Sequence, residues 1–327
     1  MILVRHHNEG NYEPYFYFAL EDYLLNEVLK DGEAYFFTWE IKGVVIGKNQ
    51  IIENEVNLDY LRANNIKLFR RPTGGGTVYA DENNTMFSMI ARRESNFSFK
   101  KHLSHIIDAV KKLGVTLEFS GRNDILYDGK KISGNAFLQN KNGMLLHGTF
   151  LYNCDLETMV RAITPDDEKL VSKGIESVRS RVTNLKPYLH DMSQQELVTH
   201  FEDEITSGVY ELSADEVRML LERAKKYAAK EWIYHQQAAY TKSLKGRING
   251  GMFNLQLLLQ DGRIKDFHIN GDFFELRPLH EFTALFKNAI YNVETMTKVA
   301  ADINFGEYFL DVAKSDFMNL LNSGIIE

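Results

Sequence analysis

The chain has 327 residues, of which 44% are hydrophobic, so it can bury one large core or two separate ones. A formal net charge of −7 argues against a general nucleic-acid-binding or membrane surface. The single cysteine, Cys154, excludes a disulfide framework or a cysteine zinc cluster within one chain. No uncharged run approaches membrane-spanning length, and we therefore expect a soluble cytoplasmic protein.

The first 150 residues are predicted to form a sheet with packed helices. Pro14 precedes apolar residues at helical spacing from Phe16 to Val28, and a second helix is expected over 99–113. The spacing of strand-like runs favours a mixed, largely antiparallel sheet, which is an α+β fold. The predicted strands cover residues 34–39, 44–46, 67–70, 78–79, 86–90, 116–119, 124–127, 130–137 and 144–152.

The connection between two of these strands is the most informative stretch. Residues 70–77 read Arg-Arg-Pro-Thr-Gly-Gly-Gly-Thr. Glycines there allow backbone N–H groups to approach a ligand closely, and two guanidinium groups suit a carboxylate or a phosphate. The simpler interpretation is a glycine-rich turn flanked by solvated arginines. Neither a P-loop nor a dinucleotide fingerprint is present, because no Gly-Lys-Ser/Thr occurs and Tyr79 stands where the fingerprint needs glycine.

Residues 121–136 contain a predicted hairpin that carries a lysine. Asp-Gly at 128–129 is a strong signal for a two-residue turn, which pairs Asp124 with Ser133. Lys131 then lies diagonal to Asp124, about 7–8 Å away between Cα atoms. Small residues leave Lys131 open to a ligand, whereas the simpler interpretation is a surface ion pair of little energy. The side chains expected on one face are Asp124, Leu126, Lys131 and Ser133.

Two helices and a second, smaller domain are predicted toward the C-terminus. Ser193 with Glu196, and Ser213 with Glu216, have the spacing of capping boxes. The periodic pattern is lost near 236–251, where we place a domain boundary. Beyond it, alternating apolar residues lead to an Asp-Gly turn, a return strand and a helix near 279–290. The expected domains cover residues 1–240 and 247–327.

Five motifs follow one another along the chain. They are the glycine loop at 70–78, Gly-Arg-Asn-Asp at 121–124, Lys-Ile-Ser-Gly at 131–134, His-Gly-Thr at 147–149 and the run 173–185. In this order they resemble the motifs of lipoate–protein ligases of the A type, a family related to biotin protein ligases and octanoyltransferases. The resemblance covers essentially the whole chain and implies a biotin-ligase-like catalytic domain with a mixed sheet and a small α+β C-terminal accessory domain.

The resemblance implies an ATP-dependent ligase that converts lipoate to lipoyl-AMP and transfers the lipoyl group to a lysine of a carrier domain. Expected carriers are the lipoyl domains of 2-oxoacid dehydrogenase acyltransferase subunits and the glycine cleavage carrier protein. Because acyl-adenylate formation brings two anions together, a cationic, backbone-lined pocket must offset their repulsion. Lys131 is the expected catalytic residue, since its compact charge bridges the lipoate carboxylate and the α-phosphate.

The resemblance also assigns binding roles. The loop 70–76 is expected to border the lipoate site, Arg71 and Gly76–Tyr79 to contact the nucleotide, and residues 164–183 to close on the adenylate. Mg²⁺ is expected with ATP, and Asp124 either binds it or orients Lys131. Besides Lys131, the expected binding residues are Arg70, Arg71, Gly74, Gly75, Gly76, Thr77, Val78, Tyr79, Asn123, Asp124, Ser133, Gly134, His147 and Gly148, with Lys173, Gly174, Arg179 and Arg181 as adenylate-loop candidates.

Some features depart from the family, and other functions stay open. Residues 80–84 lack the usual His-Asp-x-Gly-Asn, and the junction 231–236 lacks the usual Trp-x-Phe/Tyr-Gly. An ATP-independent octanoyl or lipoyl transferase acting through Cys154 is one alternative. A non-catalytic sensor of lipoate or nucleotide is another, and biotin is a third possible ligand. Cys154 has no basic neighbour in the sequence that would lower its pKa, so a buried thiol is the simpler interpretation.

Overall fold

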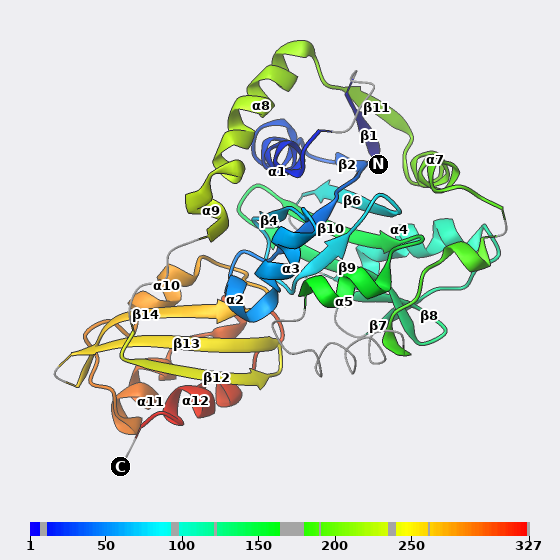
Figure 1. The fold of residues 1–327 in the computed structure, drawn as a ribbon. Coiled ribbons are helices and arrows are strands. Elements are labelled where there is room, and N and C mark those ends of the chain that lie inside the picture. The colour runs from blue at the N-terminus through cyan, green and yellow to red at the C-terminus, as the bar shows by residue number, and fades with distance from the viewer. Residues whose placement is uncertain are drawn as a thin grey trace. The chain divides into compact units, whose positions relative to one another are not determined.

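The computed structural model describes residues 1–6, 12–92, 98–120, 123–163, 180–189, 191–234, 240–260 and 262–325, which form two compact units (Figure 1). Both units combine strands with helices, which confirms the predicted α+β class. Two short segments from the N-terminal part of the chain pack with the C-terminal unit. The first unit comprises Met1–Ile46, Ile52–Arg71 and Thr77–Ile233, and the second comprises Gly47–Ile51, Pro72–Gly76 and Tyr234–Glu327.

An eight-stranded sheet is the scaffold of the first unit. Its strand order is β11-β1-β2-β6-β10-β9-β8-β7. β1 runs parallel to β11 and β2, and the other pairs are antiparallel, as the sequence predicted. The short strands β1 and β11 were not predicted. The bounds are β1 (Ile2–Arg5), β2 (Ala34–Trp39), β6 (Asn84–Ala91), β7 (Glu118–Ser120), β8 (Asp124–Tyr127), β9 (Lys130–Gln139), β10 (Met144–Leu151) and β11 (Gly208–Glu211).

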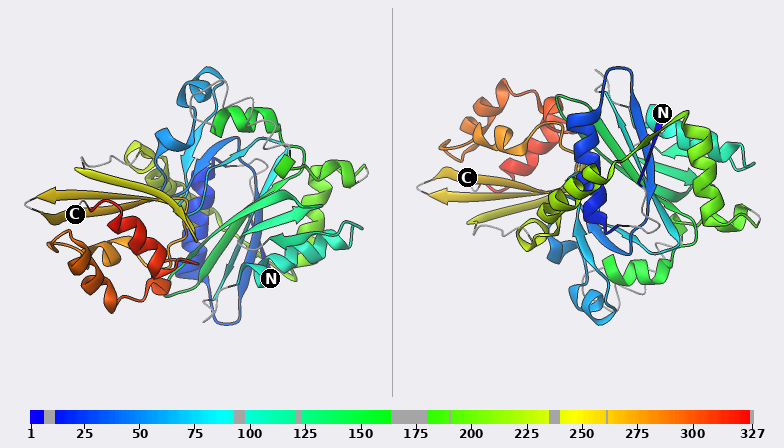
Figure 2. Two further views of the ribbon diagram at one scale, coloured as in Figure 1. Left: turned by 90° about the horizontal axis from the view of Figure 1, so that it is seen from below. Right: turned by 90° about the horizontal axis from the view of Figure 1, so that it is seen from above.

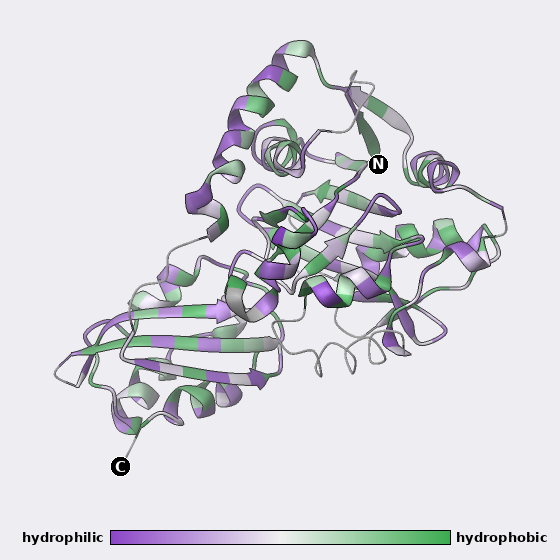
Figure 3. Cartoon of the chain, viewed as in Figure 1, coloured by the Kyte–Doolittle hydropathy of each residue, from purple (hydrophilic) through white to green (hydrophobic). Residues whose placement is uncertain are grey.

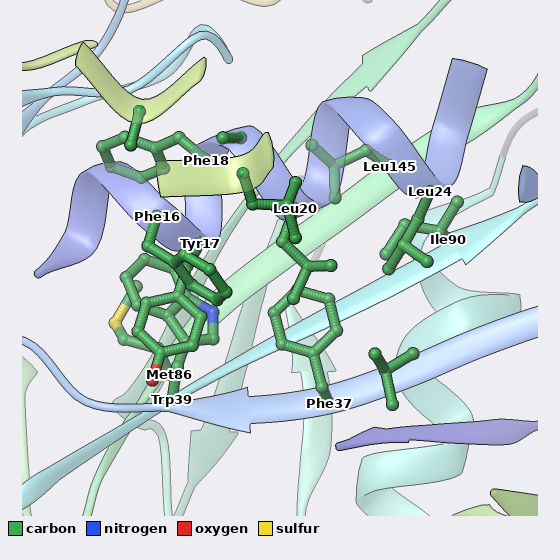
Figure 4. Close-up of a cluster of buried hydrophobic side chains, with 14 of the residues drawn as sticks. Phe16, Tyr17, Phe18, Leu20, Leu24, Phe37, Trp39, Met86, Ile90 and Leu145 are labelled. Atoms are coloured by element: carbon green, nitrogen blue, oxygen red, sulfur yellow. The ribbon is translucent and has the colours of Figure 1, made fainter. Parts of the chain in front are cut away.

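One face of this sheet is covered by α1 (Pro14–Tyr23) and α8 (Ala214–Ala228) (Figure 2). Proline at the first position favours the start of α1, which continues into a π-helical turn, η1 (Leu24–Val28). Aromatic side chains fill the interface (Figure 4): Tyr17 stacks on Trp39 with ring centroids 5.1 Å apart. These large buried rings supply much of the hydrophobic stabilisation of the first unit.

The opposite face is covered by α4 (Phe99–Lys111) and α7 (Gln194–Ile205) (Figure 2). Phe201 of α7 packs edge-on against Phe150 of β10. Both predicted capping boxes are confirmed at the starts of α7 and α8. Other short helices of this unit are α5 (Leu156–Ile163), η2 (Lys186–Tyr188) and α9 (Lys230–Tyr234), which ends at the boundary between the units.

A small second sheet has the order β4-β3-β5; β4 ends at Arg70, and β5 is the strand that follows the glycines. β3 (Gly43–Ile46) pairs in parallel with β4 (Leu68–Arg70) and antiparallel with β5 (Val78–Ala80). The loop that contains Gly74–Gly76, called the triglycine loop below, is therefore part of the connection between the two outer strands. Two short helices, α2 (Ile52–Glu55) and α3 (Leu58–Ala63), lie between β3 and β4 in the sequence.

The C-terminal unit packs a three-stranded antiparallel sheet against helices around a phenylalanine-rich core. Hydrophilic and hydrophobic residues alternate along its strands (Figure 3). The strand β12 was not predicted, because lysine, serine and arginine occupy its exposed positions. Within the described ranges, every helix is too short or too polar to cross a bilayer. The elements are β12 (Lys242–Ile248), β13 (Gly251–Gln260), β14 (Arg263–Gly271), α10 (Leu279–Ala284), α11 (Val293–Ala301), η3 (Phe305–Glu307) and α12 (Lys314–Asn322).

Candidate functional site

The predicted lysine hairpin is formed by β8 and β9. Asp128 and Gly129 have φ values of 48° and 71°, as a type I′ turn requires, so the predicted turn is confirmed. Lys131 Nζ lies 2.9 Å from Asp124 Oδ1, and the two side chains are 38% and 29% exposed. Both side chains are thus partly exposed while each holds the other in place.

The predicted register of this hairpin was wrong beyond the first two pairs. Leu126 pairs with Lys131 as expected, but Asp124 pairs with Gly134 instead of Ser133. A β-bulge at Ile132 inserts one extra residue, which shifts the pairing of the rest of β9 with β8 by one residue. Ser133 is fully buried, with its hydroxyl donating to Asn135 Oδ1 at 3.3 Å. The bulge therefore leaves Gly134, and not Ser133, on the face of Lys131.

Gly134 gives the side chain of Lys131 its path. A Cβ at this position would lie 2.8 Å from both Cε and Nζ of Lys131, which shows that the lysine extends across the glycine. The Gly134 N–H donates to Thr149 Oγ1 at 3.2 Å. A glycine here therefore lets the ammonium group lie close to the backbone of β9.

The open edge of β9 beside Lys131 is occupied by the C-terminal end of the predicted adenylate loop. Val182 forms a parallel bridge with Lys131, and the N–H of Thr183 donates to the Lys131 carbonyl at 3.0 Å. Asn184 is anchored at the end of β10, where its side chain exchanges two hydrogen bonds of 2.9 Å with the backbone of Cys154. Arg181 is exposed, whereas Lys173, Gly174 and Arg179 lie outside the described residues.

The three glycines of the triglycine loop, Gly74–Gly76, have different surroundings. A Cβ at Gly74 would lie 2.5 Å from the Phe273 carbonyl oxygen, and Gly75 has a positive φ of 85°. A Cβ at Gly76 would meet no described atom within 4 Å, and this residue is exposed. Of the expected residues that follow, Thr77 and Val78 are half-buried, and Tyr79 is buried in β5. The structure thus explains the first two glycines by backbone packing and conformation.

Both arginines before this loop are buried, so the interpretation as solvated arginines is wrong. Arg70 Nε donates to the Ile233 carbonyl at 2.8 Å. Arg71 Nη1 donates to the Val45 carbonyl at 3.3 Å. Burial lowers the pKa of Arg71 to about 10, although the negative charge of Glu21 acts in the opposite direction. Arg71 therefore stays charged at neutral pH.

Glu21, whose charge acts on Arg71, belongs to a buried polar cluster that the sequence analysis missed, formed by Glu21, Trp39, Ser88 and His147. His147 Nδ1 lies 2.8 Å from Glu21 Oε1, which also accepts a 2.6 Å hydrogen bond from Ser88. Trp39 Nε1 in turn donates to Ser88 Oγ at 2.9 Å. His147, an expected binding residue, is thus fixed in the core. The signal in the sequence from which this cluster could have been found is Glu21, a carboxylate within the apolar pattern of the first helix.

Asn123 and Gly148, two further expected binding residues, lie around the buried Asn135. The Asn135 side-chain amide donates to the Asn123 carbonyl at 2.8 Å. A Cβ at Gly148 would lie 2.0 Å from Asn135 Oδ1 and 2.8 Å from the Phe87 ring. Gly148 therefore provides the space into which Asn135 packs. This packing positions the part of β9 that follows Gly134.

Cys154 does not have the surroundings of a nucleophile. It is buried after the end of β10. Burial raises the pKa of its thiol well above the usual range, and the negative charge of Asp81 adds to this effect. Since the thiolate is the reactive form, a raised pKa opposes nucleophilic catalysis.

Two family models together match most of the chain. One describes the lipoyl protein ligase A/B catalytic domain and matches residues 13–206, and the other describes the bacterial lipoate protein ligase C-terminus and matches residues 237–321. The chain is 32% identical to lipoate-protein ligase LplJ of Bacillus subtilis, over 96% of this chain and 98% of the relative.

Solved structures show the same fold. One is LipL1 of P. falciparum in complex with lipoate, with a TM-score of 0.81 and 23% identity over 99% of this chain and 98% of that one. Another is a lipoate-protein ligase A bound with ATP, with a TM-score of 0.58 and 24% identity over 72% of this chain and 97% of that one. The similarity to the first structure extends over both units described above.

Proposed function

This chain belongs to the lipoyl protein ligase A/B catalytic-domain family, and we propose that it activates lipoate with ATP and transfers the lipoyl group to a lysine of a lipoyl carrier domain. The observation that carries this proposal is the position of Lys131. Its side chain is 38% exposed, and its ammonium group lies across Gly134 and pairs with the Asp124 carboxylate. Such a charge can bind two anions without first leaving a buried environment.

In the first half-reaction, a lipoate carboxylate oxygen attacks the α-phosphorus of ATP, and pyrophosphate leaves. Lys131 bridges the two reactants, and its positive charge offsets their mutual repulsion. The same ammonium group stabilises the negative charge that develops in the transition state. Holding both reactants at one residue also removes much of the entropic cost of bringing them together. In the free enzyme, Asp124 keeps the ammonium in place through the 2.9 Å ion pair.

In the second half-reaction, the amine of the carrier lysine attacks the lipoyl carbonyl, and AMP leaves. The segment 182–184, bonded to the Lys131 strand and to the end of β10, fixes one end of the proposed adenylate loop beside the reacting groups. Expected carriers are the lipoyl domains of 2-oxoacid dehydrogenases and the glycine cleavage carrier protein, in the cytoplasm. We assign catalysis to residues 1–240 and an accessory role to residues 247–327.

Mg²⁺ fits this site as an ion that arrives with ATP. Among the described residues, no three His, Cys, Asp or Glu side chains gather to hold a metal. One carboxylate together with phosphate oxygens is a common arrangement for Mg²⁺, and Asp124 is the residue that would supply it. The ion would neutralise phosphate charge, while Lys131 keeps the role given above.

The ATP-independent transferase is disfavoured because it depends on Cys154, whose thiol is buried and has a raised pKa. Replacing Cys154 with alanine is expected to leave lipoylation of a carrier domain within about twofold of wild type. Loss of lipoylation in a folded Cys154→Ala variant would support a thioester mechanism. Intact-mass analysis during turnover gives a second check, because a lipoyl adduct on the enzyme is expected only for the transferase.

The decisive experiment is an ATP–pyrophosphate exchange assay with lipoate, octanoate and biotin compared at equal concentrations. Exchange that depends on lipoate is expected, because the first half-reaction is reversible and releases pyrophosphate. No exchange with any of the acids at saturating ATP would point to the non-catalytic sensor. Exchange that occurs with biotin alone would show that biotin, and not lipoate, is the substrate.

A further inference from the structure

Two segments that are distant in the sequence from the C-terminal unit nevertheless belong to it: Gly47–Ile51 and Pro72–Gly76, which contains the triglycine loop. They are hydrogen-bonded to each other, since the Lys48 N–H donates to the Thr73 carbonyl at 2.8 Å. The segment 47–51 also has an internal hydrogen bond, because Gln50 Oε1 accepts from the Gly47 N–H at 2.8 Å. Whatever fixes residues 47–51 therefore also fixes the triglycine loop.

Both segments lie against one short stretch that follows β14, Phe273–Glu275. The Gly75 N–H donates to the Phe273 carbonyl at 3.1 Å, and Gly74 approaches that carbonyl so closely that no side chain fits between them. The Glu275 carboxylate forms an ion pair with Lys48 and accepts a 3.2 Å hydrogen bond from Asn49 Nδ2. The Glu275 carboxylate and the Phe273 carbonyl therefore each bind one of the segments, and the Gly271 N–H adds a 2.7 Å hydrogen bond to the Asn49 carbonyl.

The stretch 273–275 is itself rigidly placed. Phe273 and Phe274 are buried, and Phe273 stacks on Phe253 in the core of the unit with ring centroids 4.4 Å apart. The Leu310 N–H donates to the Phe274 carbonyl at 3.1 Å, and Glu275 forms a bridge with Phe309. The Glu275 side chain is only 14% exposed, so water screens its ion pair less than a surface pair.

We propose that Glu275 is a positioning residue for lipoate activation, which acts through Lys48 and Asn49 on the triglycine loop. This inference rests on the proposed function, in which that loop borders the lipoate site. Three successive glycines have no side chains to restrict their own conformation, so the loop needs an external anchor. An anchored loop binds its ligand at a lower entropic cost, which is an effect on affinity rather than on the chemical step.

The test compares Glu275→Ala and Glu275→Gln with a matched control, Glu281→Gln. Glu281 pairs with Arg277 in the same unit, but that pair is exposed and touches neither segment. In the full-length Glu275→Ala protein, KM for lipoate in pyrophosphate exchange is expected to rise about tenfold, while kcat changes less than about twofold. The control and the KM for ATP are expected to stay near wild type.

A second readout does not depend on activity. Hydrogen exchange of a peptide covering residues 72–78 is expected to become about tenfold faster in Glu275→Ala, because the segment 47–51, whose Lys48 N–H is hydrogen-bonded to Thr73, loses its ion pair. Lys48→Gln is expected to give the same acceleration, and combining it with Glu275→Gln is expected to add little, since both remove one ion pair. If Glu275→Ala fails to fold, Lys48→Gln and Glu275→Gln still allow the proposal to be tested.

Unchanged exchange at residues 72–78 in the Glu275 and Lys48 variants would overturn the proposal. It would also be overturned if exchange accelerates but KM for lipoate does not change, or if kcat and both KM values change together with a lowered Tm. If the wild-type protein shows no lipoate-dependent pyrophosphate exchange, the proposed function fails. Accelerated hydrogen exchange in the Glu275 variants would then still support anchoring of the loop.

Discussion

Two acid–base pairs, one on the β8–β9 hairpin and the other between α1 and β10, have opposite surroundings. Lys131 and Asp124 lie on the hairpin with 38% and 29% of their side chains exposed, whereas His147 and Glu21 are 3% and 0% exposed in the core. Water screens the first pair, so a ligand can take over its charges at low cost. The second pair lacks water to replace a lost partner, so it is fixed. The comparison separates a pair suited to binding from one that stabilises the fold.

The largest effect is expected from Lys131→Ala, which tests the exposed pair. We expect lipoate-dependent pyrophosphate exchange to fall about 100- to 1000-fold, because a donor to developing negative charge is lost. The free energy of unfolding is expected to change by less than about 1 kcal/mol. Lys130→Ala is the matched control, since this neighbouring lysine is exposed and pairs with Tyr127 on the hairpin. Equal loss of exchange in both variants would remove Lys131 from the mechanism.

Glu21→Ala tests the buried pair and should affect stability. Its loss removes the carboxylate oxygen that contacts both His147 and Ser88 and the negative charge that acts on Arg71, so we expect unfolding to become easier by about 3 kcal/mol. Urea denaturation of wild type, Glu21→Ala and Glu21→Gln measures this. Glu21→Gln keeps the size and an acceptor oxygen, and its cost is expected to be smaller. A Glu21→Ala protein as stable as wild type would contradict the contrast between the pairs.

Two glycines sharpen the same contrast within β9 and β10. Gly148→Ala forces a methyl group against Asn135 and Phe87, which cannot move freely, and is expected to destabilise the fold by about 2 kcal/mol. Gly134→Ala meets only the flexible end of Lys131 and Thr149. We expect Gly134→Ala to reduce pyrophosphate exchange about tenfold with nearly unchanged urea stability. The reverse assignment of the two effects would show that Lys131 does not need its path across Gly134.

The smallest effect concerns a third carboxylate, Glu216, between α1 and α8. Burial raises its pKa, but hydrogen bonds from Ser213, Tyr210 and Tyr23 outweigh this and lower the pKa to about 2. Because the folded pKa is below the unfolded value, its stabilisation is complete above about pH 4.5 and is lost as the pH falls toward 2.

Urea midpoints at pH 7 and pH 3 test this linkage. Wild type is expected to lose more stability between these two values than Glu216→Gln, which cannot titrate. Lys131→Ala is a suitable reference, since it should retain the wild-type acid dependence of Glu216. Identical pH dependence of wild type and Glu216→Gln would contradict the lowered pKa.

The sequence was sufficient for features that depend on local patterns. Residue type and spacing predict the Asp-Gly turn at 128–129, both capping boxes and the helix that begins at Pro14. The structure confirms these features. The proximity of Lys131 to Asp124 also followed from the turn. By contrast, β12 was missed because its alternation is formed by lysine, serine and arginine as well as apolar residues.

Features that depend on distant contacts were not predictable. The bulge at Ile132 follows from the burial of both Ile132 and Ser133, which no local pattern reveals. Arg70 and Arg71 were expected at an accessible loop, but tertiary packing buries both against carbonyl groups. The contact of Gly74 with Phe273 joins residues almost 200 positions apart.

By itself, the sequence determined the fold class, the family and the hairpin that carries the lysine proposed to be catalytic, because turns, periodicity and ordered motifs are encoded in neighbouring residues. Only the tertiary structure decided which charges are buried, which face Gly134 shares with Lys131 and what holds the triglycine loop. Burial and hydrogen-bond partners are set by chain segments that meet only in the folded protein, and these surroundings determine whether a charge stabilises the core or remains available to a ligand.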